Sequence, residues 1–206
     1  MEETIYYPQD EMTTMLIPVT SGCPYNQCAF CSMYQGVPYE VLPVCEMERL
    51  LMVGDPYTEK VFLTGADPLA MGFEALKERL EMIRSYFPYG ARVASYGSVR
   101  SLSGYSEDEL AELHDSGLRL LYIGFETGSD PVLRLMGKGH TVEEAVAQGN
   151  KLNRARLMFH SIVMYGLAGE GQGKDNALAT AEMLNRFATS RVITMNLTVF
   201  YGTRLS

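Results

Sequence analysis

The sequence predicts an α/β fold in which a parallel sheet curves into a partial (β/α)6, TIM-like barrel. Short apolar segments alternate with segments of helical periodicity along most of the chain, and the connections between them are short. Strand–helix alternation of this kind favours right-handed crossovers and parallel strands. A doubly wound sheet and an incomplete barrel both satisfy it, so the choice depends on which residues each face of a strand carries.

Six apolar segments are predicted as strands. They cover residues 15–20, 60–64, 91–96, 119–125, 157–165 and 192–200. The first (MLIPVT) runs directly into a cysteine-rich stretch, and the second (KVFLT) reads as a buried strand that stops at Gly65-Ala66-Asp67-Pro68.

Five helices are predicted between these strands, over residues 45–53, 73–86, 106–117, 141–154 and 175–187. A Gly-Asp-Pro sequence at residues 54–56 ends the first, and apolar residues three and four apart mark the second. The third and fourth each begin with a capping box, formed by Ser106 with Glu109 and by Thr141 with Glu144.

The faces of two strands favour the partial barrel. One face of residues 119–126 carries Leu120, Tyr122, Gly124 and Glu126, and the other carries Leu121, Ile123 and Phe125. In the last strand, Thr194, Asn196 and Thr198 share one face, and Ile193, Met195, Leu197 and Val199 share the other. We expect the apolar faces to meet the helices and the mixed faces to line a concave interior with small and polar groups. Such a lining suits a ligand better than a fully packed barrel would.

Composition limits the class of protein. With 206 residues, 47% of them hydrophobic, we expect one domain over residues 1–206, with residues 1–13 as an N-terminal lead-in. The net charge of −8 argues against a general nucleic-acid-binding surface, and no apolar run is long enough to cross a membrane. The N-terminus lacks the features of a secretory signal, and four unevenly spaced cysteines indicate a reducing compartment, the cytoplasm.

Three of the four cysteines, Cys23, Cys28 and Cys31, fall within nine residues. Thiolates gathered this closely hold a soft metal or an iron–sulfur cluster, and three ligands leave one coordination position open for chemistry. Two alternatives also use Cys45: a four-cysteine zinc site, and an electron carrier with the plant-type ferredoxin spacing. We favour a buried core thiol for Cys45, and a core histidine with satisfied ring nitrogens for His160.

Five stretches resemble, in chain order, motifs of the radical S-adenosylmethionine (SAM) superfamily. They are Cys23-Pro-Tyr-Asn-Gln-Cys28-Ala-Phe-Cys31, Leu63-Thr-Gly-Ala-Asp67-Pro68, Ile123-Gly-Phe-Glu126-Thr-Gly-Ser-Asp130, Leu135-Met-Gly-Lys138-Gly-His140-Thr141 and Tyr165-Gly-Leu-Ala-Gly169-Glu170. The likeness is to the branch that contains oxygen-independent coproporphyrinogen oxidases and methylthiotransferases. Two departures stand out: four residues rather than three separate the first two cysteines, and Gly-Ala-Asp-Pro replaces Gly-Gly-Glu-Pro.

The resemblance implies an enzyme with a [4Fe–4S] cluster on Cys23, Cys28 and Cys31. The cluster would reductively cleave SAM to a 5′-deoxyadenosyl radical, which abstracts hydrogen from a substrate that the sequence does not identify. An external electron donor of the flavodoxin or ferredoxin type is implied. Relatives usually continue past the sixth strand, so the resemblance also implies that a C-terminal extension is absent and that a partner or a missing extension covers the barrel.

The resemblance also implies a set of SAM contacts. Gly65, Ala66 and Asp67 would meet the ammonium, Glu126 the ribose hydroxyls and Lys138 the carboxylate of SAM. Phe30, Gly166 and Asn196 would lie against the adenine, with Ser95 and Ser161 as weaker candidates for the same pocket.

Overall fold

Six parallel strands form one sheet whose order follows the chain, β1-β4-β5-β6-β7-β8. Their bounds are β1 Met15–Pro18, β4 Lys60–Thr64, β5 Arg92–Gly97, β6 Leu118–Glu126, β7 Met158–Tyr165 and β8 Arg191–Asn196. The computed structural model describes residues 5–206, and within this range β1 and β8 are unpaired edges. The sheet is therefore an open one, which confirms the predicted α/β fold and its partial barrel.

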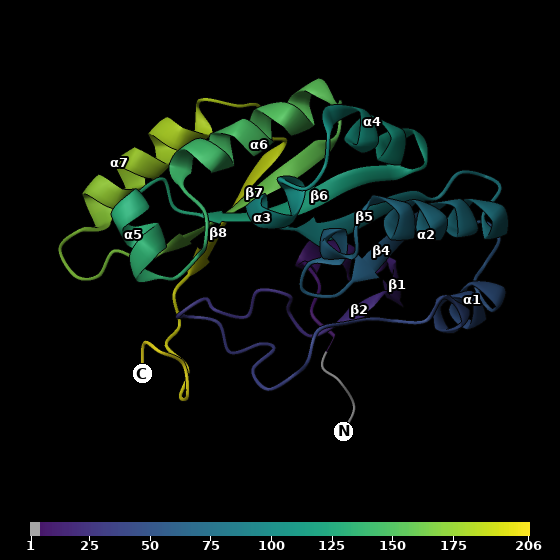
Figure 1. The fold of residues 1–206 in the computed structure, drawn as a ribbon, viewed down its shortest axis with the longest axis horizontal. Coiled ribbons are helices and arrows are strands. Elements are labelled where there is room, and N and C mark those ends of the chain that lie inside the picture. The colour runs from purple at the N-terminus through teal and green to yellow at the C-terminus, as the bar shows by residue number, and fades with distance from the viewer. Residues whose placement is uncertain (1–4) are drawn as a thin grey trace.

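Helices connect the strands and cover one face of the sheet (Figure 1). Their bounds are α1 Val44–Met52, α2 Phe73–Tyr86, α3 Val99–Leu102, α4 Glu107–Asp115, α5 Asp130–Leu135, α6 Val142–Arg154 and α7 Gly173–Leu184. On α2, Leu76, Leu80 and Ile83 recur at helical spacing and are fully buried in the core under the sheet. Each such side chain stabilises the fold by roughly 1.5–3 kcal/mol.

Both predicted capping boxes are present. Ser106 accepts from the amide of Glu109 at the start of α4, and Thr141 accepts from that of Glu144 at the start of α6, with each glutamate returning the bond. These local signals explain why the beginnings of the two helices could be read from the sequence. In residues 5–206, no helix is long and apolar enough to span a bilayer.

Among residues 5–206, six short elements were not predicted: β2, β3, α3, α5 and the 3-10 turns Gln9–Glu11 and Pro68–Met71. The first predicted strand is interrupted at Val19, and β2 (Thr20–Ser21) pairs antiparallel with β3 (Glu40–Val41). Helices α3 and α5 are too short to show a hydrophobic period. The last strand ends at Asn196 rather than at Phe200, because its pairing with β7 ends there.

The inner face of the sheet carries an aromatic cluster of Phe62, Tyr96 and Tyr122, whose rings meet edge to face at centroid distances of 5.3–6.0 Å. Glu11, in the short 3-10 turn Gln9–Glu11 before β1, lies against this cluster. Its Oε1 accepts from the Tyr122 hydroxyl at 2.7 Å, and its Oε2 accepts from the Thr14 hydroxyl at 2.6 Å. The middle of the interior is therefore aromatic, where we expected small and polar groups.

The predicted faces are right for β6 and wrong for β8. Leu121, Ile123 and Phe125 of β6 lie in the helix-facing core, as predicted. In β8, however, Ile193 packs on the inner aromatic cluster. Alternation then places Asn196 on the other face, where it is exposed. Because β8 is an edge strand, its apolar face lies on the side where other side chains cover it, which is the barrel interior.

Segments outside the sheet connect its two edges. Asp10, in the turn before β1, pairs with Arg191 at the start of β8. After β8, the chain runs back beside the loop between β2 and β3 (Figure 1). There Arg204 donates to the carbonyl of Gln27, and Gln35 Nε2 donates to the carbonyl of Gly202 at 3.3 Å.

Candidate functional site

The three clustered cysteines lie on the loop between β2 and β3, residues 22–39, which we call the cysteine loop. Cys23, Cys28 and Cys31 are half-buried, and none is in a disulfide. From Met12 to Tyr39 the sequence contains no charged residue. Any charge that acts on the thiols therefore comes from other parts of the fold.

Burial raises the pKa of the Cys28 and Cys31 thiols above the ordinary value for cysteine. The strongest opposing effect is the positive charge of Lys138 for Cys28 and the backbone amide of Met33 for Cys31. Without a metal these thiols thus keep their protons, and a metal that binds must displace those protons.

Residues 135–140 pack directly beneath the cysteine loop. The amide of Ala29 donates to the carbonyl of Met136 at 2.8 Å. Gly137 and Gly139 both have positive φ, and a Cβ there would lie 2.8 Å from the Gln27 carbonyl and 2.5 Å from the Tyr25 hydroxyl. The two glycines are required for this close approach, and they place the residue between them, Lys138, beside the cysteines.

Glu126 and Lys138 form a buried ion pair, with Lys138 Nζ 2.8 Å from Glu126 Oε1. Glu126 ends β6 in the left-handed region, with a φ of 65°. A Cβ on Gly124 would lie 2.5 Å from Glu126 Oε1, so the carboxylate covers Gly124 on the inner face. Within residues 5–206, the buried Oε2 has no hydrogen-bond partner. A buried acceptor left in this state costs about 1–3 kcal/mol, so the site calls for a ligand or water at Oε2.

Lys138 connects the ion pair to the cysteine loop. Burial acts to lower its pKa, but the negative charges of Glu126 and then Cys28 outweigh burial and raise the pKa. Its Nζ also lies 6.0 Å from the centre of the Phe30 ring. The structure therefore brings Phe30, Glu126 and Lys138 together with the cysteines.

The glycine-rich turn after β4 lies at the base of the cysteine loop. Gly65 has a φ of +139°, and a Cβ there would lie 2.0 Å from Thr20 Oγ1. Asp67 is buried and accepts from Ser98 Oγ at 2.6 Å and Ser101 Oγ at 2.9 Å. Burial raises the pKa of the Asp67 carboxyl, and these two hydrogen bonds oppose the rise. Both oxygens of Asp67 thus already serve to hold α3 against the turn.

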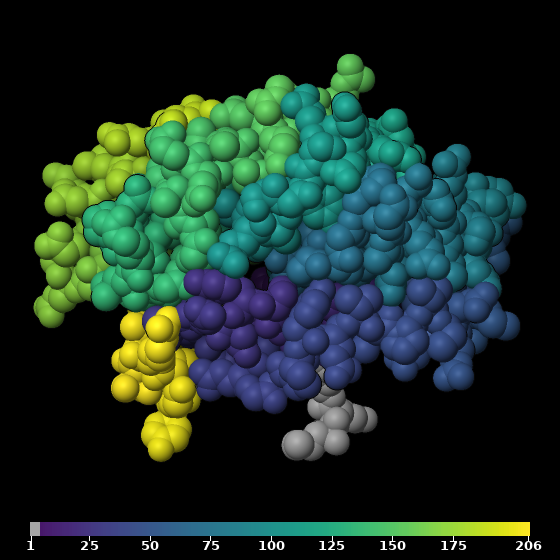
Figure 2. All heavy atoms as spheres, viewed as in Figure 1, coloured from purple at the N-terminus to yellow at the C-terminus, as the bar shows by residue number. Residues whose placement is uncertain are grey.

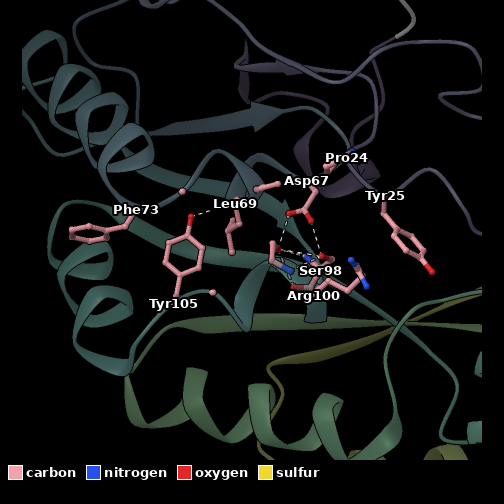
Figure 3. A pocket seen from close by; sticks show the side chains of 12 residues that line it. Pro24, Tyr25, Asp67, Leu69, Phe73, Ser98, Arg100 and Tyr105 are labelled. Carbon is pink, nitrogen blue, oxygen red and sulfur yellow. Dashed lines mark hydrogen bonds between the residues drawn. The ribbon is translucent and has the colours of Figure 1, made fainter.

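A cavity of about 310 Å³ lies between the cysteine loop, the turn after β4 and α3. In the space-filling view a hollow is visible where purple atoms of the N-terminal region meet teal atoms (Figure 2). Asp67 and Ser98 lie at its centre, with Phe73 and Tyr105 at one end and Tyr25 and Arg100 toward the other (Figure 3).

Sequence reasoning missed the contact between Tyr25 and Arg100. The Arg100 guanidinium lies 4.4 Å from the centre of the Tyr25 ring and donates to the Gly139 carbonyl at 3.2 Å. Nothing local in the sequence indicates this contact, because the two residues are 75 positions apart. The glycines on either side of Lys138 were the available signal that another chain segment approaches here.

Four predicted candidates are not brought to this cluster of side chains. Ser95 and Ser161 are fully buried, but they pair in register with Leu121 and Ile123 and so face the helices. Gly166 follows β7 with positive φ, and a Cβ there would lie 3.2 Å from Leu197. Asn196 is exposed on the outward face, so its predicted place in the interior is wrong.

Two further predictions need correction. Cys45 is exposed on α1 rather than buried in the core, since that helix buries only Met47 and Leu51. His160 does lie in the interior, with its ring 5.1 Å from that of Tyr122. Its buried Nδ1, however, has no hydrogen-bond partner among the described residues.

The family model of the radical SAM superfamily matches residues 17–200, which include the cysteine loop and all of the sheet except the first two residues of β1. The chain belongs to the radical SAM superfamily. Members carry a [4Fe–4S] cluster and use SAM, and the membership indicates an enzyme.

Among curated proteins, the radical SAM chain is similar to tRNA-2-methylthio-N(6)-dimethylallyladenosine synthase of Ehrlichia chaffeensis. The two are 24% identical over 175 residues, which are 80% of this chain and 39% of that protein. The chain therefore spans well under half the length of this relative. The match agrees with the branch that the motifs resemble.

Solved structures with the same fold include methylornithine synthase and coproporphyrinogen III oxidase from Escherichia coli. The first superposes with a TM-score of 0.71 at 16% identity, over 93% of this chain and 55% of that one. The second gives a TM-score of 0.67 at 15% identity, over 90% and 44%. At these identities the likeness shows the fold alone.

The radical SAM residues present fit a cluster with three protein ligands. The three cysteines are close enough for the charge of one thiolate to raise the pKa of another, and the positive charge of Lys138 lowers the pKa of Cys28 and Cys31. In residues 5–206, no group of three or more His, Cys, Asp and Glu side chains is arranged around a single metal ion. A [4Fe–4S] cluster does not need such convergence, because each thiolate binds a different iron.

Proposed function

We propose that this chain is the core of a radical SAM enzyme that abstracts hydrogen from its substrate. The observation that carries the proposal is the position of the half-satisfied Glu126 carboxylate. It lies at the carboxyl end of β6, paired with a lysine that also acts on Cys28. In open α/β sheets, ligands bind at the carboxyl ends of the strands.

Cys23, Cys28 and Cys31 would hold the [4Fe–4S] cluster as thiolates. When bound, the cluster would supply the electron for reductive cleavage of SAM, which is the source of the hydrogen abstraction from substrate. An electron-transfer protein that also uses Cys45 is not favoured, because Cys45 is exposed on α1, a helix that packs on α2 and β1.

The ion pair would orient SAM at two of its polar groups. Glu126 Oε2 would accept from a ribose hydroxyl, and the ammonium of Lys138 would meet the SAM carboxylate. Because Lys138 holds Glu126 Oε1, the second oxygen is kept in a fixed position. The charge on Lys138 also limits the repulsion between Glu126 and the cysteine thiolates.

The glycine turn would meet the SAM ammonium with its backbone carbonyls. Gly65 and Ala66 are the residues we propose for this, whereas Asp67 acts indirectly by holding the turn against α3. Phe30 and Gly166 stay proposals for the adenine contact. We do not keep Asn196, whose side chain belongs to the outward face.

The superfamily chemistry requires a reductant. We propose a flavodoxin- or ferredoxin-like donor, a reducing cytoplasmic location in keeping with four free cysteines, and cover for the barrel from a partner or a further segment. The substrate is not assigned, since the match over residues 17–200 is to a superfamily model and not to a single enzyme.

Anaerobic reconstitution with iron and sulfide, followed by SAM and a chemical reductant, tests this function. We expect visible iron–sulfur absorption and release of 5′-deoxyadenosine. A cluster that forms but neither binds nor cleaves SAM would favour the electron carrier, and zinc retention without visible absorption would favour a zinc site.

A further inference from the structure

Asn26 has an unusual backbone conformation within the cysteine loop. Its φ is 45°, and among residues 5–206 only Glu126 and Arg156 are other non-glycine residues with positive φ. The Asn26 amide donates to Cys23 Sγ at 3.3 Å, and its side-chain Nδ2 donates to the Tyr34 carbonyl at 2.9 Å. The residue is exposed, so burial does not impose this conformation.

The local sequence explains how the amide reaches the sulfur. Cys23-Pro24-Tyr25-Asn26 has proline at its second position, where the fixed φ of the ring favours a turn. Asparagine is among the few residues that tolerate the left-handed region, which β-branched residues avoid. The turn occupies the four-residue spacing between Cys23 and Cys28, one residue longer than is common in the superfamily.

Each of the three sulfurs has its own source of positive potential. Cys28 faces the charge of Lys138, and Cys31 receives the amide of Met33. For Cys23 that source is the amide of Asn26. Hydrogen bonds to the sulfurs of a cluster are among the factors that set its reduction potential.

We propose that Asn26 is a positioning residue for the cluster, holding its amide on the Cys23 sulfur and thereby raising the reduction potential. The inference rests on the proposed function, since it requires the cluster. The reduced cluster carries more negative charge than the oxidised one, so a donor at the sulfur stabilises the reduced form more. Asn26 thus acts through the left-handed conformation of its backbone, which presents the amide to Cys23 Sγ, and not through its side-chain bond to the Tyr34 carbonyl.

Three variants of the reconstituted full chain test this proposal. Asn26→Val makes the left-handed conformation unfavourable, so the amide leaves the sulfur and the midpoint potential falls in an EPR-monitored redox titration. Asn26→Gly keeps both the conformation and the amide, so its potential stays at that of the unchanged protein. Gln27→Val is the matched control, because it puts the same side chain at an exposed neighbour whose amide makes no bond to sulfur.

An unchanged potential in Asn26→Val with full iron content would overturn the proposal. An equal fall in Asn26→Gly would also overturn it, since the side-chain bond would then be the cause. If Asn26→Val does not load iron, pulsed EPR on the unchanged protein with 15N-asparagine decides. A 15N coupling to the reduced cluster that disappears in Asn26→Gly supports the inference, and no coupling overturns it. Failure of the unchanged protein to form any cluster would instead refute the proposed function.

Discussion

Glu11 and Glu126 are both buried carboxylates on the inside of the sheet, but their surroundings differ. Glu11, before β1 at the amino end, is 5% exposed, and each of its oxygens accepts a hydrogen bond from a hydroxyl group. Glu126, at the carboxyl end of β6, is 7% exposed, and only one of its oxygens has a partner in residues 5–206.

This difference separates a structural carboxylate from one that is prepared for a ligand. Both carboxylate oxygens of Glu11 have hydrogen-bond partners, so Glu11 is a structural part of the interior. Glu126 adopts a backbone conformation that most residues avoid, and it has both a charged partner and an unsatisfied oxygen. Such combinations occur at functional sites. Four predictions test the contrast.

The largest effect is expected at the carboxyl end. Replacing any one of Cys23, Cys28 and Cys31 by alanine should abolish the visible absorption of the reconstituted cluster, because each supplies one of three ligands. Cys45→Ala should retain it. Loss of the absorption in Cys45→Ala would restore the four-cysteine alternatives.

At the amino end, Glu11→Ala should destabilise the fold by about 1–3 kcal/mol, because the buried Tyr122 hydroxyl loses its acceptor. Denaturant unfolding of the metal-free protein measures this loss. Glu182→Ala, at an exposed position on α7, is the control and should have little effect. A weaker SAM affinity in Glu11→Ala at unchanged stability would remove the distinction between the two carboxylates.

Glu126→Gln keeps the shape of the side chain but removes its charge. We expect the affinity for SAM to fall about tenfold, or about 1.4 kcal/mol, in calorimetry on the cluster-loaded protein. The cluster spectrum should not change. Equal losses of folding stability in Glu126→Gln and Lys138→Met, at unchanged SAM affinity, would instead make the ion pair structural.

The smallest effect concerns His140, two residues after Lys138. Burial and then the charge of Lys138 lower its pKa to about 4, and its buried Nε2 has no partner in the described chain. The unfolded chain therefore takes up this proton first, so the contribution of His140 to stability is present above about pH 6.5 and is lost as the pH falls toward 4. His140→Gln should flatten this part of the stability profile, and an unchanged profile in this variant would contradict the assignment.

Local signals in the sequence were sufficient for much of the fold. The capping boxes at Ser106 and Thr141 predicted where α4 and α6 begin, and alternation predicted the faces of β6. The cysteine spacing predicted a set of three thiols that the fold does place on one loop. In each case the relevant residues are neighbours in the chain.

Predictions failed where a residue's surroundings come from distant segments. The faces of β8 were misassigned because its inward neighbours belong to other strands. Cys45 was placed in the core, although the pattern of α1 only permits and does not require its burial. The ion pair between Glu126 and Lys138 does not follow from the local sequence, because it depends on how residues 135–140 pack against the cysteine loop.

The pairing of Asp10 with Arg191 has a mechanical consequence. In a closed barrel, backbone hydrogen bonds fix the circumference, and salt has little effect on them. Here an ion pair between two half-exposed side chains joins the edges, and added salt weakens such a contact. At the amino end the two edges of the sheet are thus linked by an ion pair between side chains rather than by backbone hydrogen bonds. Ionic strength can weaken this link while every strand pairing remains intact.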